Sequence, residues 1–184
     1  MRRVFRSLSV LTMLATGCTI MATYQAEQAK WQGLADQATA HFGVGAVTVV
    51  LKGNRTTGEY RRLERTLDLG TANSVAGMEW LLAHELGHHI RGHVNAYLEQ
   101  EMEANATAVR VLQVWGRSEE EAVRLAGNIL LSVKKNGSTL TGKGHDWCAE
   151  FTDLRARYPQ YTPRDPAKVN ATCPGAGWTT KRPA

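Results

Sequence analysis

The chain has 184 residues, the length of one domain with or without a tail. Hydrophobic residues make up 43% and charged residues 21%, close to the averages for a soluble globular protein, which argues against wholesale disorder and against a polytopic membrane protein. Three cysteines are too few for a miniprotein held together by disulfides. The net charge of +5 is a mild nucleic-acid signal, but much of it comes from the N-terminus.

The N-terminus has the features of a secretion signal. Three arginines lie within the first six residues, and the apolar run 8–15 that follows is shorter than the about 20 residues needed to span a bilayer. The run leads into Leu14-Ala15-Thr16-Gly17-Cys18, where small residues before a cysteine resemble the bacterial lipobox. We expect residues 1–17 to be a lipoprotein signal peptide and Cys18 to carry the lipid. The alternative is an ordinary secretion signal with an incidental cysteine.

Removal of that segment changes the expected partners. The mature chain keeps 19 of the 22 basic residues against 17 acidic ones, a net charge of +2, so we expect no nucleic-acid partner. Lipid on Cys18 would anchor the protein to a membrane of the bacterial envelope, and Thr19 is compatible with the periplasmic face of the outer membrane in a Gram-negative source. Cys148 and Cys173 are expected to pair in that oxidising compartment, with two separate thiols as the alternative.

Hydrophobic patterns, glycines and capping residues predict an α+β chain that is mostly helical, with a small sheet before the main helices. Residues 18–45 are expected to form a stalk or the first packed helix, residues 46–158 one domain, and the proline-rich tail 159–184 an irregular segment. The predicted elements are a helix over 21–42, a strand over 46–52, one or two strands within 59–69, a helix over 75–91 capped by Asn73 or Ser74 and ended by Gly92, a helix over 96–115 ended by Gly116, a helix over 119–135 with Ser118 and Glu121 as capping box, and a helix over 147–158.

An H-E-x-x-H sequence, His84-Glu85-Leu86-Gly87-His88, lies within the predicted helix 75–91. Residues four apart on an α-helix are offset by about 40° and 6 Å, so His84 and His88 leave one face and can bind one ion. Zinc takes imidazole nitrogen at about 2.0–2.1 Å, which this spacing allows. Glu85 lies about 100° further round, off the line of the two ligands, where it can take a proton from water. The alternative is a helix with ordinary surface histidines.

A catalytic zinc needs a third protein ligand. One proposal is the metzincin pattern, in which a glycine and a further histidine follow the second histidine at fixed positions. Gly92 and His93 each miss those positions by one residue, and His93 is expected to project away from the ligand face and to be structural.

The competing proposal is a carboxylate on the following helix. Glu101 and Asn105 are four residues apart and share a face, so Glu101 can bind the metal while Asn105 bonds the free ring nitrogen of a ligand histidine. Glu103 points the opposite way and is expected to face solvent. Ala104 and Ala108 are small enough to let the two helices approach closely.

These residues together resemble the gluzincin metallopeptidases of the prenyl-protease/HtpX-like group, which includes small periplasmic lipoproteins. The resemblance covers about residues 75–131. It implies a zincin-like core in which the H-E-x-x-H helix packs on a following ligand helix. It also implies one Zn²⁺ per chain, with His84, His88 and Glu101 as ligands and Glu85 as general base.

Two departures from that family are visible. The family usually has Asp where Asn105 stands, and it often has a His-Pro loop that His145 matches without the proline. His145 is therefore a candidate catalytic residue, as an oxyanion donor or closing ligand, and an ordinary loop histidine is the alternative.

The expected function is a zinc-dependent endopeptidase that hydrolyses unfolded or damaged envelope proteins, with a strand edge from the region 46–69 aligning the peptide. The competing class is a non-catalytic zinc-binding envelope lipoprotein that serves as an adaptor or chaperone. Retention of Glu85 argues against the second class, because a purely structural site has no use for a base beside an open position.

Overall fold

The computed structural model describes residues 5–95, 97–135, 145–161 and 166–174, and describes side chains in these ranges except for 5–21 and 134–135. The chain is α+β and mostly helical, as the sequence predicts. The elements are α1 (Phe5–Phe42), β1 (Thr48–Lys52), β2 (Gly58–Arg61), β3 (Thr66–Gly70), α2 (Val75–Arg91), α3 (Leu98–Val114), α4 (Glu119–Lys135), α5 (Trp147–Arg157) and α6 (Pro166–Thr172).

The three strands form one sheet in the order β1–β3–β2. β1 is parallel to β3, with Val49 opposite Leu67, and β2 is antiparallel to β3, with Tyr60 opposite the same Leu67. The predicted region 59–69 therefore supplies two strands. β2 lies at one edge of the sheet, on the side of α2.

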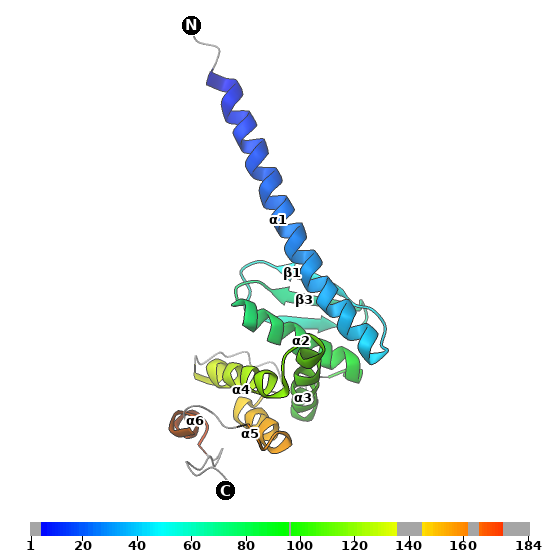
Figure 1. The fold of residues 1–184 in the computed structure, drawn as a ribbon, viewed down its shortest axis with the longest axis vertical. Helices are drawn as coiled ribbons and strands as arrows, with labels where there is room; N and C mark the ends of the chain where they lie inside the picture. Colours follow the sequence, from blue (N-terminus) through cyan, green and yellow to red (C-terminus); the bar gives the residue numbers. More distant parts are fainter. Residues whose placement is uncertain (1–4, 96, 136–144, 162–165, 175–184) are drawn as a thin grey trace.

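The second half of α1 belongs to the folded body, which answers whether this helix is a stalk or a packed element. Trp31, Ala35 and Ala38 follow helical spacing and are fully buried. Gln32 covers the outer edge of β1: its amide donates to the Val47 carbonyl over 2.8 Å and accepts from the Val49 N–H over 2.9 Å. The first half of α1 projects away from the body (Figure 1).

Helix α2 lies between the sheet and the helices α3 to α5 (Figure 1). It begins at Ser74, whose hydroxyl accepts from the Gly77 N–H over 3.2 Å, and it ends at Gly92, which has a left-handed φ of 69°. Leu82, Ala83 and Leu86 are fully buried on it, so the helix that carries the histidine motif is fixed by the core.

Helix α4 begins at the predicted capping box. The Ser118 N–H donates to Glu121 Oε2 over 2.9 Å, and the Glu121 N–H donates back to the Ser118 hydroxyl over 3.3 Å. Among the helices of the described ranges, none combines the length with the apolar character needed to cross a bilayer. Cys18 falls within α1, but its side chain is outside the described ones, so its lipidation and the signal peptide 1–17 stay predictions.

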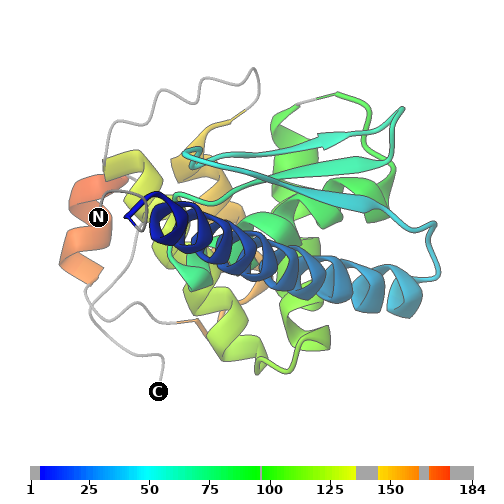
Figure 2. The ribbon, with the colours of Figure 1, turned by 90° about the horizontal axis from the view of Figure 1, so that it is seen from above.

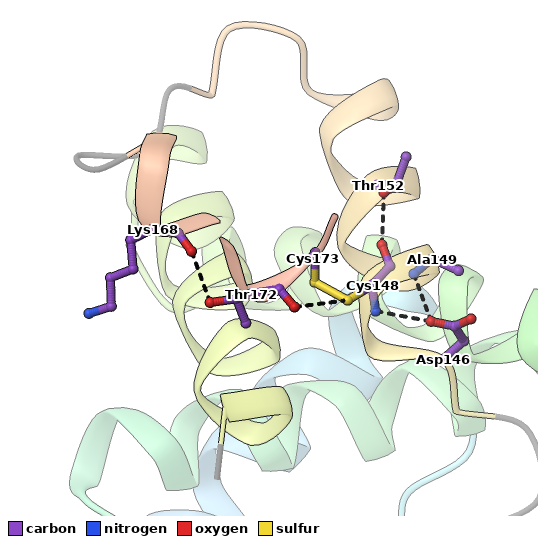
Figure 3. The surroundings of a disulfide bond; sticks show 7 residues. All are labelled: Asp146, Cys148, Ala149, Thr152, Lys168, Thr172 and Cys173. Atoms are coloured by element: carbon purple, nitrogen blue, oxygen red, sulfur yellow. Dashed lines mark hydrogen bonds between the residues drawn. A yellow bond between two sulfur atoms is a disulfide. The ribbon is translucent and has the colours of Figure 1, made fainter. Parts of the chain in front are cut away.

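The C-terminal tail differs from the expected irregular segment, because residues 166–172 form the short helix α6. Cys148 and Cys173, which were expected to pair, are joined by a disulfide with a Cα–Cα distance of 5.4 Å (Figure 3). This bond ties the end of α6 to the first turn of α5, and the buried side chain of Val169 packs α6 on the core. These two contacts explain why residues 166–172 form a helix. α6 lies at the opposite end of the molecule from the C-terminal end of α1 (Figure 2).

Candidate metal centre

His84 and His88 leave α2 on one face and meet Glu101 from α3. The two Nε2 atoms are 3.2 Å apart, and Glu101 Oε2 lies 3.2 Å from His84 Nε2 and 3.4 Å from His88 Nε2. Glu101 is only 2% exposed, and no donor reaches its Oε2 in good hydrogen-bond geometry. This group of three side chains could hold a metal ion.

The spacing of these atoms fits a small tetrahedral ion. Ligand atoms about 2.05 Å from the centre of a tetrahedron are about 3.3 Å from one another, and the three observed separations are 3.2, 3.2 and 3.4 Å. Two imidazole nitrogens and one carboxylate oxygen are a donor set typical of catalytic zinc, which uses three protein ligands and leaves the fourth position open. The sequence alternative with His93 as third ligand is not supported, because His93 is outside this group of ligand atoms.

Close packing of α2 on α3 makes the meeting possible. A Cβ added to Gly87 would lie 2.6 Å from the carbonyl oxygen of Ala104, so the glycine lets the two backbones approach more closely than any side chain allows. Ala104, which meets Gly87, and Ala108, one turn further along α3, are both fully buried, and both are small as expected.

The orientation of His84 is set by two residues behind it. Its Nδ1 lies 2.9 Å from Asn105 Oδ1, and Asn105 Nδ2 donates to Glu150 Oε2 over 2.7 Å. Because a carboxylate only accepts, the Asn105 amide must turn its NH₂ to Glu150 and its oxygen to His84. His84 then donates from Nδ1, which leaves the lone pair of its Nε2 directed at the site.

His88 is oriented by a similar chain through His93, which is structural as expected but lies against the motif and does not project away from it. His93 Nε2 lies 3.2 Å from Glu103 Oε2, and its Nδ1 lies 3.0 Å from Nδ1 of His88. Glu103 accepts from His93, so a neutral His93 accepts from His88, whose Nε2 again faces the site. Burial lowers the pKa of His93 and outweighs the hydrogen bond with Glu103, which acts to raise it. The lowered pKa favours the neutral form of His93. The left-handed turn at Gly92 brings His93 back under the motif.

Glu103 therefore has a role that its surface position did not suggest. Its side chain is 53% exposed, as expected, but its carboxylate accepts a hydrogen bond from His93.

Glu150 was not among the residues that the sequence analysis identified. It is fully buried on the face of α5 that also buries Phe151 and Leu154, and a carboxylate on such an apolar face is the signal that could have identified it.

The acidic side chains around His84 and His88 favour a bound cation. Burial alone would lower the pKa of His84, but the close contact with the Glu101 carboxylate and the charges of Glu85, Glu101 and Glu150 outweigh it and raise the pKa to about 9. Burial opposes ionisation of Glu101, yet contacts with His84 and His88 hold the pKa of its carboxyl well below the usual range. The negative charge that raises this pKa would also favour a bound metal cation.

Glu85 points from the same helix toward the sheet. Its Oε2 accepts from the N–H of Tyr60 over 2.9 Å, so the edge strand β2 holds the carboxylate in place. A Cβ on Gly58 would lie 2.8 Å from Glu85 Cγ, so this glycine leaves the room that the carboxylate occupies. Both β2 contacts were missed from the sequence, because nothing in the motif specifies which strand lies beside it.

His145 lies at the same site. Its Nδ1 is 3.0 Å from Glu150 Oε1 and 3.5 Å from Glu101 Oε2, and its ring stacks on Trp147 with centroids 4.3 Å apart. It is not among the three side chains that could hold the ion. His84, Glu85 and His145 all line one cleft of about 630 Å³, so one histidine of the metal group, the candidate base and His145 face a common space.

Asn105→Asp should weaken the site, although the family that the sequence resembles usually has Asp there. The new carboxylate would stand where the amide now donates to buried Glu150, so two carboxylates would face each other and one would have to take up a proton or move. We expect a lower unfolding temperature and about 10–100-fold weaker zinc binding. The double variant Asn105→Asp/Glu150→Gln should recover most of both losses, because an amide can donate to the new carboxylate. Thermal unfolding and zinc competition titrations test this; an Asn105→Asp protein as stable and tight-binding as the parent would contradict it.

Comparisons with known protein families, with curated proteins and with solved structures find no match for this chain.

Proposed function

We propose that this protein is a zinc-dependent endopeptidase with a zincin-like core. The observation that carries the proposal is the convergence of His84, His88 and Glu101 beside a cleft that Glu85 also lines. The donor set and spacing suit Zn²⁺, and a carboxylate that is not a ligand stands one residue after the first histidine. A purely structural site has four protein ligands and needs no such base.

The reaction divides between the ion and the chain. His84, His88 and Glu101 would hold the ion, and zinc bound there would supply Lewis-acid chemistry toward a substrate carbonyl and a water molecule. Glu85 takes the proton from the attacking water and returns it to the leaving amine. The hydrogen bond from the Tyr60 N–H keeps one carboxylate oxygen of Glu85 fixed and leaves the other for the proton.

His145 and strand β2 complete the proposed machinery. Glu150 accepts from His145 Nδ1, which leaves the Nε2 edge of the ring as the candidate donor toward a developing oxyanion. β2 is an edge strand of the sheet and lies beside Glu85, so an extended peptide can pair with it. Main-chain pairing selects weakly among side chains, which suits unfolded or damaged proteins as substrates.

The cellular setting follows from the N-terminal sequence. We propose that lipid on Cys18 anchors the protein to the cell envelope, at the periplasmic face of the outer membrane in a Gram-negative source. The disulfide between Cys148 and Cys173 is consistent with an oxidising compartment.

Digestion of unfolded casein by the purified protein, with metal analysis of the same sample, tests the proposal. We expect about one zinc per chain, hydrolysis that chelation abolishes, and recovery when zinc is restored. Bound zinc without any hydrolysis would instead support the non-catalytic lipoprotein.

Zinc binding should be strongly pH-dependent. Because the pKa of His84 is raised to about 9 in the metal-free protein, zinc must displace a proton there, and the apparent affinity should rise about tenfold per pH unit up to about pH 9 and then level off. Protonation of His84 also stabilises the fold when no metal is bound. This stabilisation is complete below pH 6.5, the ordinary pKa of histidine, and it is lost as the pH rises through about 9. Calorimetric titrations at pH 7.5 in two buffers of different ionisation enthalpy should show release of about one proton; no release would contradict the raised pKa.

A further inference from the structure

A second pocket lies at the C-terminal end of strand β2, where the hairpin that leads to β3 approaches the last turn of α2. Its volume is about 550 Å³. Its lining includes Gly45, then Tyr60, Arg62, Leu63 and Arg65 from β2 and the hairpin, and His89 from α2. None of these residues lines the cleft beside Glu85, and the proposed reaction does not use this pocket.

Tyr60 and His89 are the half-buried side chains of this pocket, and hydrogen bonds hold both in place. The Tyr60 hydroxyl lies 2.7 Å from Nδ1 of His89, and Nε2 of His89 lies 2.6 Å from the carbonyl oxygen of Gly45. Because a carbonyl oxygen only accepts, His89 donates to Gly45 and joins α2 to the segment that enters β1. This part of the lining is therefore built before a ligand enters, and it contains no carboxylate.

Two arginines of the lining, Arg62 and Arg65, have no acidic partner among the described residues. Glu64 and Asp68, the carboxylates of the hairpin and of β3, both pair with Arg61 instead. Both unpaired arginines act on Tyr60, because burial raises the pKa of its hydroxyl and their positive charges oppose that rise. Two positive charges thus face one pocket whose described lining has no negative charge.

Arg65 stands at a backbone position that favours glycine. Its φ is 48°, in the left-handed region, and its N–H donates to the Arg62 carbonyl over 3.2 Å, which closes the turn. Glycine or asparagine fits such a position with less strain than arginine. Gly45 leaves room for the guanidinium group, because a Cβ there would lie 3.1 Å from Arg65 Nη1. A strained arginine that is given this room and has no acidic partner points to a ligand of opposite charge.

We propose that this pocket binds the carboxylate of an acidic side chain of the peptide substrate, a few residues from the bond that is cut. The proposal rests on the proposed function in taking the ligand to be the substrate. Tyr60 connects the two sites, because its N–H donates to Glu85 and its hydroxyl lies in the pocket. A peptide extended along β2 advances about 3.3 Å per residue, so a side chain about two to four residues from the cut bond can reach the arginines. Planar guanidinium groups bind carboxylates through paired hydrogen bonds.

An anionic membrane is the other ligand that two arginines could bind, but the fold places the hairpin away from the proposed anchor. Thr66 at the start of β3 pairs with Thr48, just after the C-terminal end of α1, whereas Cys18 lies in the other half of that helix. The helix between Cys18 and Phe42 is about 36 Å long. Lipid on Cys18 would hold the membrane at the far end of α1, so the position of the hairpin favours a peptide.

Binding tests the proposal without hydrolysis. The Glu85→Gln protein, loaded with zinc, is titrated with peptides that are blocked at both ends and differ only in one central residue, Glu, Gln or Lys, in a neutral Gly/Ser/Thr background. We expect the Glu peptide to bind about tenfold more tightly than the Gln peptide and the Lys peptide to bind most weakly. The preference for Glu should shrink at high salt. Equal affinities for the three peptides would overturn the proposal.

Arg65→Asn in the same background should remove most of the preference for Glu. Asparagine adopts a left-handed φ more readily than arginine, so this variant should unfold at no lower temperature than its parent. Arg62→Gln is the second variant. The control is Lys30→Gln, which removes one positive charge from an exposed position on α1 outside both pockets and should keep the preference. An unchanged preference in both arginine variants would overturn the proposal. So would binding to anionic lipid vesicles, but not to the Glu peptide, that depends on these arginines.

Cleavage by the parent protein separates this proposal from the proposed function. Fragments of digested casein, mapped by mass spectrometry, should show Asp and Glu concentrated at one position a few residues from the cut bond, and Arg65→Asn should remove that concentration. Hydrolysis with no such concentration and no effect of Arg65→Asn would leave the peptidase standing and overturn the acidic site. Preferential binding of the Glu peptide without any hydrolysis by the parent would support the acidic site and contradict the peptidase.

Discussion

Glu85→Gln is expected to keep its zinc and lose peptide hydrolysis by about 10²–10⁴-fold. An amide oxygen can still accept from the Tyr60 N–H, so the side chain should stay in place and the fold should be unchanged. An amide cannot take a proton from water, so the chemical step should fail, whereas the three proposed metal ligands are unchanged. Steady-state rates on casein and zinc per chain, measured on the same preparations, give the two readouts.

The matched control for this variant is Glu99→Gln. Glu99 is an exposed glutamate near the start of α3, so its change removes the same charge without altering the cleft or the metal group. We expect it to retain both zinc and activity. A Glu85→Gln protein with unchanged hydrolysis would rule out the assigned base, and one that has lost its zinc would show that Glu85 acts through the metal group instead.

Glu101→Ala is expected to lower the zinc affinity by more than about 100-fold, beyond the 10–100-fold that loss of an outer hydrogen-bond partner costs. Glu101 Oε2 is the third of the converging atoms. Among the described residues, the nearest candidate to replace it is His145. Its Nδ1 lies 3.5 Å from Glu101 Oε2, but His145 is not part of the group that could hold the ion. Activity should fall with the metal, and the variant should resemble the chelated parent protein.

Glu103→Ala, two residues along the same helix, is the control. It removes only the acceptor of His93, so we expect zinc to be retained with at most about a tenfold loss of affinity. Competition with a zinc chelator of known affinity, together with circular dichroism to confirm folding, measures both variants. The reverse result, loss in Glu103→Ala and retention in Glu101→Ala, would move the third ligand by two positions.

Local structure around the motif could be predicted because it depends on neighbours in the sequence. Ser74 and Gly92 bound α2, and Ser118 with Glu121 begins α4, since caps act over three or four residues. The pairing of His84 with His88 needs only the helical repeat. These features are present in any packing of the helices, so the packing did not have to be known.

The choice among distant partners could not be made this way. Glu101 and His93 were both open as third ligand until the approach of α3 at Gly87 placed Glu101 between the two imidazoles. The direction of the Asn105 amide depends on Glu150, 45 residues further along the chain. The direction of the His93 side chain was predicted wrongly because a helical projection ignores the left-handed turn at Gly92.

What the sequence determined by itself is a helix with two histidines on one face and a carboxylate beside them. The tertiary structure decided which carboxylate meets those histidines, how each ring is turned, and that an edge strand and a cleft adjoin the base. The physical reason is range: capping and helical repetition are fixed within one or two turns, whereas a metal group needs atoms from separate helices placed to within a few tenths of an ångström, and only the packed core sets that distance.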